Sequence, residues 1–262
     1  MGKAKVLILR TAGTNCDYET QSAFEECKAV VEKLHINAAI GEKDKILKYD
    51  ILVFPGGFSY GDDIASGKIL ANEVKSKLGD ILQKFASSKR PIIGICNGFQ
   101  VLVKMGLLPD NKLFEQISTL SYNDSNKFEC RWVYLKTKVS DKDKVKCLWT
   151  KNLPDIITLP IAHGEGKFIP KNKKIIDDLK KNHQIVLRYC DRDAGIPQYP
   201  LDPNGSVEQI AGICNPDGNV FGLMPHPERF VFAFQHPLRQ SKDFGKYGWG
   251  KIIFQNAVDY VK

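Results

Sequence analysis

The first hundred residues alternate between short apolar runs and helical patterns, and this alternation most constrains the fold. The apolar runs are VLILR (Val6–Arg10), DILVFPGG (Asp50–Gly57) and RPIIGIC (Arg90–Cys96). Runs of this length that end at polar or turn residues are typical of strands buried on both faces. Between them we expect helices at about Tyr18–Leu34 and Ile69–Ser87, the first capped by Asn15 or Asp17. This order predicts a parallel sheet covered on both sides, and therefore an α/β fold.

The remaining elements extend this pattern. We expect a second short strand at INAAIG, a helix whose first part is Phe99–Met105, and a closing helix at Trp249–Val261. The second half is richer in strands, namely RWVYLKTKV, HQIVLRYC, SVEQIAGICN and NVFGLM, with a Pro-Asp-Gly hairpin turn between the last two. Because the chain has no linker, repeat or low-complexity tract, we expect residues 1–262 to form a single domain.

Composition excludes several classes of protein. With 43% hydrophobic and 26% charged residues, the chain is neither disordered nor a membrane protein, and no apolar run approaches the roughly 20 residues of a membrane span. Its seven cysteines form no C-x-x-C pair, which argues against a zinc ribbon or a redox dithiol. The N-terminal run ends at Arg10 and is too short for a signal peptide. We therefore expect reduced thiols and a cytoplasmic protein.

The net charge of +8 raises the question of nucleic-acid binding. The lysines are spread along the chain and become denser only at Lys136–Lys151 and Lys167–Lys181, where acids and apolar residues alternate with them. No basic stripe with interleaved aromatics is present in the sequence. Solvated lysine faces, or a docking surface for an acidic partner protein, explain the charge better than a nucleic-acid site does.

The segment Gly94-Ile95-Cys96-Asn97-Gly98 has the form of a nucleophile elbow, with cysteine in place of serine. A tight strand-to-helix turn requires small flanking residues and places the nucleophile at the carboxyl edge of the sheet, where ligands bind in such folds. The helix N-terminus favours the thiolate. A buried core cysteine is the alternative interpretation.

A thiolate nucleophile needs a base, and His226 is the best candidate among five histidines. It lies in Met-Pro-His-Pro-Glu, directly after a predicted strand. The flanking prolines hold the backbone extended, so His226 and Glu228 point the same way. Glu228 can then orient the imidazole, as the third member of a catalytic triad does. Among the other histidines, His35 is expected to be structural, His183 to be solvated in a lysine-rich turn, and His236 to have no identifiable partner.

Acyl chemistry also needs hydrogen-bond donors for the oxyanion. The backbone N–H of Asn97, which follows the nucleophile, is one candidate. Pro55-Gly56-Gly57-Phe58 ends a neighbouring strand, and its glycines let the backbone approach a ligand closely. The N–H of Gly57 or Phe58 is the expected second donor, although a plain turn is the alternative.

Two motifs resemble nucleotide or metal sites but do not fit them. SYGDDIASGKI fails the phosphate-loop pattern because five residues, not four, separate Gly61 from Gly67 and Ile69 replaces the magnesium-binding Ser or Thr. We therefore expect no nucleotide cofactor and no metal in this chain. Asp62 and Asp63 are expected to make loop hydrogen bonds or cap a helix.

Together, GICNGFQ, PGGFSYGDDIASGKI and MPHPER resemble the triad-class glutamine amidotransferases. Within that class the chain is most similar to the glutaminase subunits of phosphoribosylformylglycinamidine synthase. The longer strings NDSNKFECRW, LPIAHGEGKF and QYPLDPNGSVEQIAGICNPDGNVFGLMPHPER carry this closer resemblance, which covers nearly the whole chain. It implies a flavodoxin-like three-layer sandwich with a mostly parallel sheet.

The resemblance also implies an activity and partners. Cys96 would attack the side-chain amide of glutamine and release ammonia, and Gln100 would help to hold glutamine. The ammonia would pass to a separate synthetase subunit, which uses ATP and magnesium to convert formylglycinamide ribonucleotide to formylglycinamidine ribonucleotide. A small third protein would help the complex to assemble. In this setting HGEGKF, with His163 and Glu165, is expected to be a flexible loop that senses the partner, or else a plain surface turn.

Three other functions remain as alternatives. The elbow is also compatible with a cysteine peptidase or related hydrolase, which a substrate comparison would distinguish. A regulatory subunit without activity is a second alternative, although the complete set of Cys96, His226 and Glu228 argues against it. A nucleic-acid binder is the third, and it rests on net charge alone.

Overall fold

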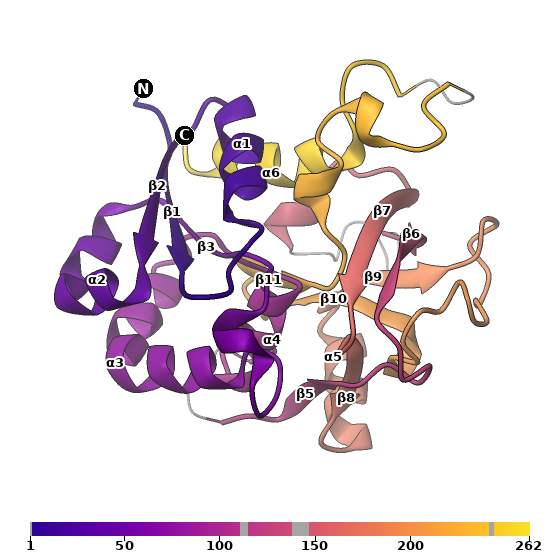
Figure 1. Cartoon of the computed structure of the whole chain (residues 1–262), viewed down its shortest axis with the longest axis horizontal. Helices are drawn as coiled ribbons and strands as arrows, with labels where there is room; N and C mark the ends of the chain where they lie inside the picture. Colours follow the sequence, from indigo (N-terminus) through magenta and orange to yellow (C-terminus); the bar gives the residue numbers. More distant parts are fainter. Residues whose placement is uncertain (1, 111–114, 138–146, 241–243) are drawn as a thin grey trace.

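A twisted nine-stranded sheet forms the centre of the molecule (Figure 1). The computed structural model describes residues 2–110, 115–137, 147–240 and 244–262. The strand order is β2-β1-β3-β4-β11-β10-β9-β6-β7, and β5 pairs separately with β8. The strands are β1 (Lys5–Arg10), β2 (Val30–His35), β3 (Ile51–Phe54), β4 (Ile92–Ile95), β5 (Ser118–Ser121), β6 (Glu129–Lys136), β7 (Ile156–His163), β8 (Lys167–Pro170), β9 (Ile185–Cys190), β10 (Ile210–Cys214) and β11 (Val220–Leu223).

The sheet has a parallel half and an antiparallel half. The neighbours from β2 to β11 pair in parallel, whereas β10, β9, β6 and β7 continue the sheet through antiparallel pairs. These pairings make only β10 and β6 run against the other strands, so the predicted mostly parallel sheet is confirmed. The predicted hairpin between β10 and β11 is also confirmed.

Helices cover both faces of the parallel half, which gives the predicted three-layer sandwich. The α-helices are α1 (Asp17–Glu26), α2 (Ile36–Gly41), α3 (Lys68–Ser87), α4 (Asn97–Lys104), α5 (Lys173–Lys181) and α6 (Trp249–Tyr260). The 3-10 helices are η1 (Lys43–Lys48), η2 (Ser59–Asp62), η4 (Leu148–Thr150), η5 (Val207–Gln209), η6 (Pro227–Arg229) and η7 (Ala233–Gln235). Helices α1 and α6 lie together on one side, with Phe24 packed edge-on against Phe254, whereas α3 and α4 lie on the other (Figure 1).

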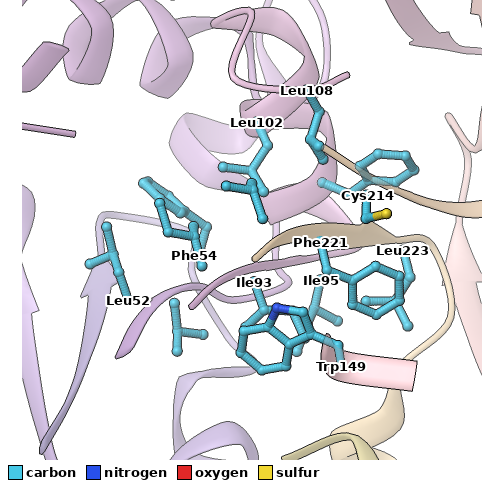
Figure 2. Packing of buried hydrophobic residues seen from close by; sticks show 14 of the residues in the cluster. Leu52, Phe54, Ile93, Ile95, Leu102, Leu108, Trp149, Cys214, Phe221 and Leu223 are labelled. Carbon is cyan, nitrogen blue, oxygen red and sulfur yellow. The ribbon is translucent and has the colours of Figure 1, made fainter. Parts of the chain in front are cut away.

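The core is built on the central parallel strands. Figure 2 shows side chains of β3, β4 and β11 packed against Leu102 and Leu108 on one side and Trp149 on the other. Ile93 of β4 and Phe221 of β11 are fully buried, as the apolar runs predict. Each such side chain contributes about 1.5–3 kcal/mol of burial free energy. The sheet edge that carries the elbow is therefore supported by a closely packed core.

The structure corrects the prediction for residues 18–41. Helix α1 ends at Glu26, VVEKLH forms the edge strand β2, and INAAIG forms helix α2 instead of a strand. The VVEKLH sequence fits either period, and its pairing with β1 decides between them. The N-cap of α1 is Cys16, not Asn15 or Asp17. His35 accepts a hydrogen bond from the Asn37 N–H (3.2 Å) and caps α2.

Two further sequence expectations concern membrane spans and the lysine-rich region. No helix among the described residues is long and apolar enough to cross a membrane. Most of the lysine-rich region at 136–151 lies outside the described residues, so its solvated face stays a prediction.

Candidate active site

Cys96 occupies a strained turn between β4 and α4. Its φ of 50° and ψ of −105° are rarely adopted by a residue with a side chain. A Cβ at Gly94 would come within 2.5 Å of the Gly98 carbonyl oxygen, and one at Gly98 within 1.8 Å of the Phe54 oxygen. Glycine is therefore required on both sides of the turn. This is the backbone geometry that the elbow pattern predicts.

His226 and Glu228 follow the neighbouring parallel strand β11 and form a buried pair. The Nδ1 atom of His226 lies 2.6 Å from Oε1 of Glu228, and both residues are 2% exposed. A carboxylate accepts, so Nδ1 carries the proton and Nε2 presents a lone pair. This Nε2 is buried without a hydrogen-bond partner among the described residues. The pair has the arrangement of a base and its orienter.

The protonated form of His226 is stabilised where it lies. Burial lowers the pKa of His226, but the charges of Glu228 and Cys96 and the contact with Cys16 outweigh it. The pKa is consequently raised well above its ordinary value. The Cys96 thiol itself donates a long hydrogen bond to the Ala162 carbonyl (3.6 Å). His226 can therefore hold a proton here, as the base of a Cys–His pair must.

The Gly56-Gly57 loop lies beside this pair, at the end of β3. The Phe58 N–H donates to the Gly13 carbonyl (2.9 Å), so Phe58 is not the second oxyanion donor that the sequence allowed. The N–H of Gly57 has no acceptor among the described residues. Gly57 has a φ of 147°, and a Cβ there would lie 2.8 Å from the Thr14 Cα. The Asn97 N–H, in the first turn of α4, likewise has no acceptor in the described part of the chain, and together with Gly57 it can stabilise an oxyanion.

A segment of the antiparallel half closes the site from the other side. The His226 N–H donates to the Pro160 carbonyl (2.8 Å), which brings β7 against the residues after β11. His163, at the end of β7, is buried, and its Nδ1 lies 3.1 Å from Oδ1 of Asn123. Asn123 also accepts the Gly166 N–H (3.0 Å). The HGEGKF segment is thus not a plain exposed turn, and these bonds argue against the flexibility expected of it.

Burial and the nearby charge of His226 lower the pKa of His163 to about 3. The amide of Asn123 donates from Nδ2 to two carbonyls, those of Lys127 and His163, each at 2.9 Å. Its oxygen must therefore face His163 as an acceptor, and Nδ1 of His163 carries the proton. His163 is held as a neutral imidazole, and its low pKa makes it a poor proton acceptor beside His226.

Glu165 connects the HGEGKF segment to α4. Its carboxylate accepts from the Ser66 N–H (3.2 Å) and lies 4.0 Å from the Lys104 ammonium. Its carbonyl oxygen accepts from Nε2 of Gln100 (2.6 Å). Burial lowers the pKa of Lys104, and Glu165 opposes that effect. The buried charges of Lys104 and Glu165 therefore compensate one another.

Gln100 uses both of its polar atoms within the protein. Besides its bond to Glu165, its Oε1 accepts from Nδ2 of Asn97 (3.1 Å). The same Nδ2 donates to Asp62 (3.0 Å), which also accepts from the Ser66 hydroxyl (2.9 Å). The prediction that Asp62 makes loop hydrogen bonds is confirmed. A direct contact between Gln100 and glutamine stays a prediction.

The structure adds residues that the sequence did not single out. Lys104 was detectable, because Cys96, Gln100 and Lys104 follow one another at helical spacing on α4. Cys16 and Arg229 carried no local signal. Cys16 lies against the catalytic pair, with its Sγ 4.0 Å from Nδ1 of His226, and Nη2 of Arg229 lies 3.2 Å from that sulfur.

Cys16, His226 and Glu228 place one sulfur, one nitrogen and one oxygen atom within 4.8 Å of one another. Zinc accepts such a donor set. The Arg229 guanidinium beside the sulfur opposes a cation, and Nδ1 of His226 is already used by Glu228. We assign no metal to these residues.

Comparisons with known proteins agree with this geometry. The sequence pattern of the CobB/CobQ-like glutamine amidotransferase domain matches residues 3–261. The chain is 45% identical to the phosphoribosylformylglycinamidine synthase subunit PurQ of Methanococcus maripaludis, covering 98% of this chain and 97% of that protein. It is 44% identical to the PurQ subunit of Dehalococcoides mccartyi, covering 100% and 99%. A chain in the structure of PurLQS from Thermotoga maritima matches with a TM-score of 0.72 and 32% identity, over 100% of both chains.

Proposed function

This chain belongs to the CobB/CobQ-like glutamine amidotransferase family, and on that premise we propose that it is the glutaminase subunit of a phosphoribosylformylglycinamidine synthase. The observation that carries the activity is the strained Cys96 elbow beside the buried His226–Glu228 pair. The PurQ relatives, which match over nearly their whole length, support the choice of synthase. We further propose that residues 1–262 act as one glutaminase domain, because the family pattern spans almost the entire chain.

The reaction begins with proton transfer from the Cys96 thiol to Nε2 of His226. The thiolate then attacks the side-chain amide carbon of glutamine. The carbonyl oxygen becomes an oxyanion, which the N–H groups of Asn97 and Gly57 stabilise. As the tetrahedral intermediate collapses, His226 returns its proton to the leaving nitrogen and ammonia departs. A glutamyl thioester remains on Cys96.

Water completes the cycle. His226 takes a proton from a water molecule as it attacks the thioester, and the same oxyanion donors act again. The carbon–sulfur bond breaks, glutamate leaves, and His226 returns the proton to Cys96. Glutamine and water are thus converted to glutamate and ammonia. Through both halves Glu228 holds the imidazole and stabilises its positive charge.

The ammonia is used elsewhere in the complex. We propose that it passes to a synthetase subunit, where ATP and magnesium drive the conversion of formylglycinamide ribonucleotide to formylglycinamidine ribonucleotide. A small third subunit helps the complex to assemble. The matched PurLQS structure supports this set of partners. The chain itself needs no cofactor, and neither nucleic acid nor membrane is a partner. Its seven free thiols favour a cytoplasmic location.

The Ala162–Glu165 segment is proposed to report partner docking to the nucleophile. It contacts the Cys96 sulfur through the Ala162 carbonyl and reaches α4 through Glu165 and Gln100. A small displacement of the segment would change both contacts. His163 would keep the segment in place through its bond to Asn123.

A reconstituted complex tests the proposed activity. Cys96→Ser should reduce glutamine-dependent synthesis at least about 1000-fold, since the weaker serine nucleophile replaces the thiolate. Synthesis from added ammonium should stay unchanged, because the synthetase is untouched. Cys130→Ser, which alters an exposed thiol, is the matched control. Glutamine-dependent synthesis that survives in Cys96→Ser would overturn the assignment.

A further inference from the structure

Cys16 is a buried thiol that the reaction above does not use. It lies between β1 and α1 and is 1% exposed. Its sulfur is 4.0 Å from Nδ1 of His226, the nitrogen that Glu228 also contacts. The base is therefore contacted at Nδ1 by a second group besides its carboxylate partner. The charge of Cys96, the proposed nucleophile, also raises the pKa of the His226 ring.

Arg229 determines how the Cys16 thiol is oriented. Nη2 of Arg229 donates to the sulfur at 3.2 Å, and the thiol donates to Oδ1 of Asn15, also at 3.2 Å. Nε of Arg229 is held in turn by Glu19 (2.8 Å). The sulfur is thus placed by a charged donor and a neutral acceptor. Burial raises the pKa of Cys16, so the thiol stays neutral and does not compete as a nucleophile.

Cys16 also connects the base to the oxyanion loop. Its N–H donates to the Gly56 carbonyl (3.2 Å). A Cβ at Gly56 would lie 2.9 Å from Cε1 of His226 and 3.0 Å from the Cys16 sulfur. The loop, the sulfur and the ring are therefore in close packing. Displacing the sulfur would let both the ring and the loop move.

We propose that Cys16, oriented by Arg229, is a positioning residue for the catalytic base. It holds the His226 ring against Glu228 and keeps the ring packed beside the loop after β3. Both residues act through His226 and touch no reacting atom. The role in catalysis rests on the proposed glutaminase function, whereas the effect on the Cys96–His226 pair does not. Sulfur is large and polarisable enough to pack against the ring edge at 4.0 Å, where a methyl group would leave a gap.

Cys27, at the other end of the same helix, supplies a matched control. It is also 1% exposed and flanks the C-terminal end of α1, just as Cys16 flanks the N-terminal end. Its thiol donates a long bond to the Lys251 carbonyl (3.9 Å) and has no role near the base. Truncation of either cysteine removes one buried sulfur from the same end-of-helix setting. Only truncation of Cys16 should change the chemistry of Cys96.

Alkylation of Cys96 by iodoacetamide, followed by peptide mass spectrometry across pH 5–10, tests this on the full-length chain. In Cys16→Ala the rate of Cys96 alkylation at neutral pH should fall about threefold to tenfold. The reason is that a less stable protonated form of His226 supports less thiolate on Cys96. The rate should return to wild type at alkaline pH, where the thiolate forms unaided. Cys16→Ser should lie between the two, and Cys27→Ala should follow the wild-type profile.

Glutamine hydrolysis in the reconstituted complex supplies the second readout. In Cys16→Ala kcat should fall by the same factor while KM stays unchanged, because the substrate contacts remain. A wild-type alkylation profile in Cys16→Ala, or an equal shift in Cys27→Ala, would overturn the proposal. If the profile shifts but the wild type hydrolyses no glutamine, the positioning role stands and the glutaminase assignment fails. Should Cys16→Ala not fold, Cys16→Ser and Arg229→Gln provide the same comparison.

Discussion

The two halves of the sheet contribute to the site in different ways. The parallel half supplies the side chains that react, because Cys96 and His226 follow the adjacent strands β4 and β11. The antiparallel half supplies mainly backbone, namely the carbonyls of Pro160 and Ala162 on β7. Strand ends that point the same way gather side chains at one edge. The antiparallel strands extend the sheet and then enclose that edge.

Each half also holds a buried histidine, and the two have opposite charge preferences. Burial lowers the pKa of both rings. At His226 the carboxylate of Glu228, together with Cys96 and Cys16, outweighs the effect, whereas at His163 the neutral amide of Asn123 cannot. The difference shows that the partner of a buried imidazole, not its depth, decides whether it can carry the charge in catalysis.

Removal of the Glu228 carboxylate should have the largest effect on this contrast. In Glu228→Gln the His226 ring would resemble His163, with an amide as its partner. We expect kcat to fall about 1000-fold or more, as it does when the acid of a comparable triad is neutralised. Because Glu228 raises the pKa of His226, its loss should also move the alkaline limb of the kcat profile to lower pH. A kcat within tenfold of wild type would contradict this role for Glu228.

Crowding of the elbow should have the next largest effect, and it acts on stability. Gly98→Ala would place a Cβ 1.8 Å from the Phe54 oxygen, which should cost about 3 kcal/mol of unfolding free energy. Gly41→Ala is the control, because a Cβ there meets nothing within 4 Å. Urea unfolding followed by circular dichroism measures both variants. Equal midpoints for Gly98→Ala and Gly41→Ala would show that the elbow tolerates a side chain.

The smallest effect is expected on the antiparallel side. Glu165→Gln keeps the backbone bond to Gln100 but leaves Lys104 buried without its nearest anion. We expect about a threefold to tenfold loss of partner-stimulated glutamine hydrolysis, because the segment near Cys96 is less firmly held. Assays with and without the synthetase subunit separate the two rates. Unchanged rates in both assays would refute the partner-sensing role of this segment.

The sequence alone determined the features that depend on neighbouring residues. The elbow was recognisable because a strained turn needs glycine two residues before and after Cys96. The His226–Glu228 pair was recognisable because residues two apart in an extended chain face the same way. Buried strands such as β4 were identified from their unbroken apolar runs.

Only the tertiary structure decided the rest. Pairing with β1 made residues 30–35 a strand instead of the end of a helix. The bond from Phe58 to Gly13 left Gly57 as the free donor of the loop. Cys16 and Arg229 meet at the base although 213 positions separate them along the chain. Such contacts depend on how distant segments pack, and no local periodicity or turn chemistry encodes them.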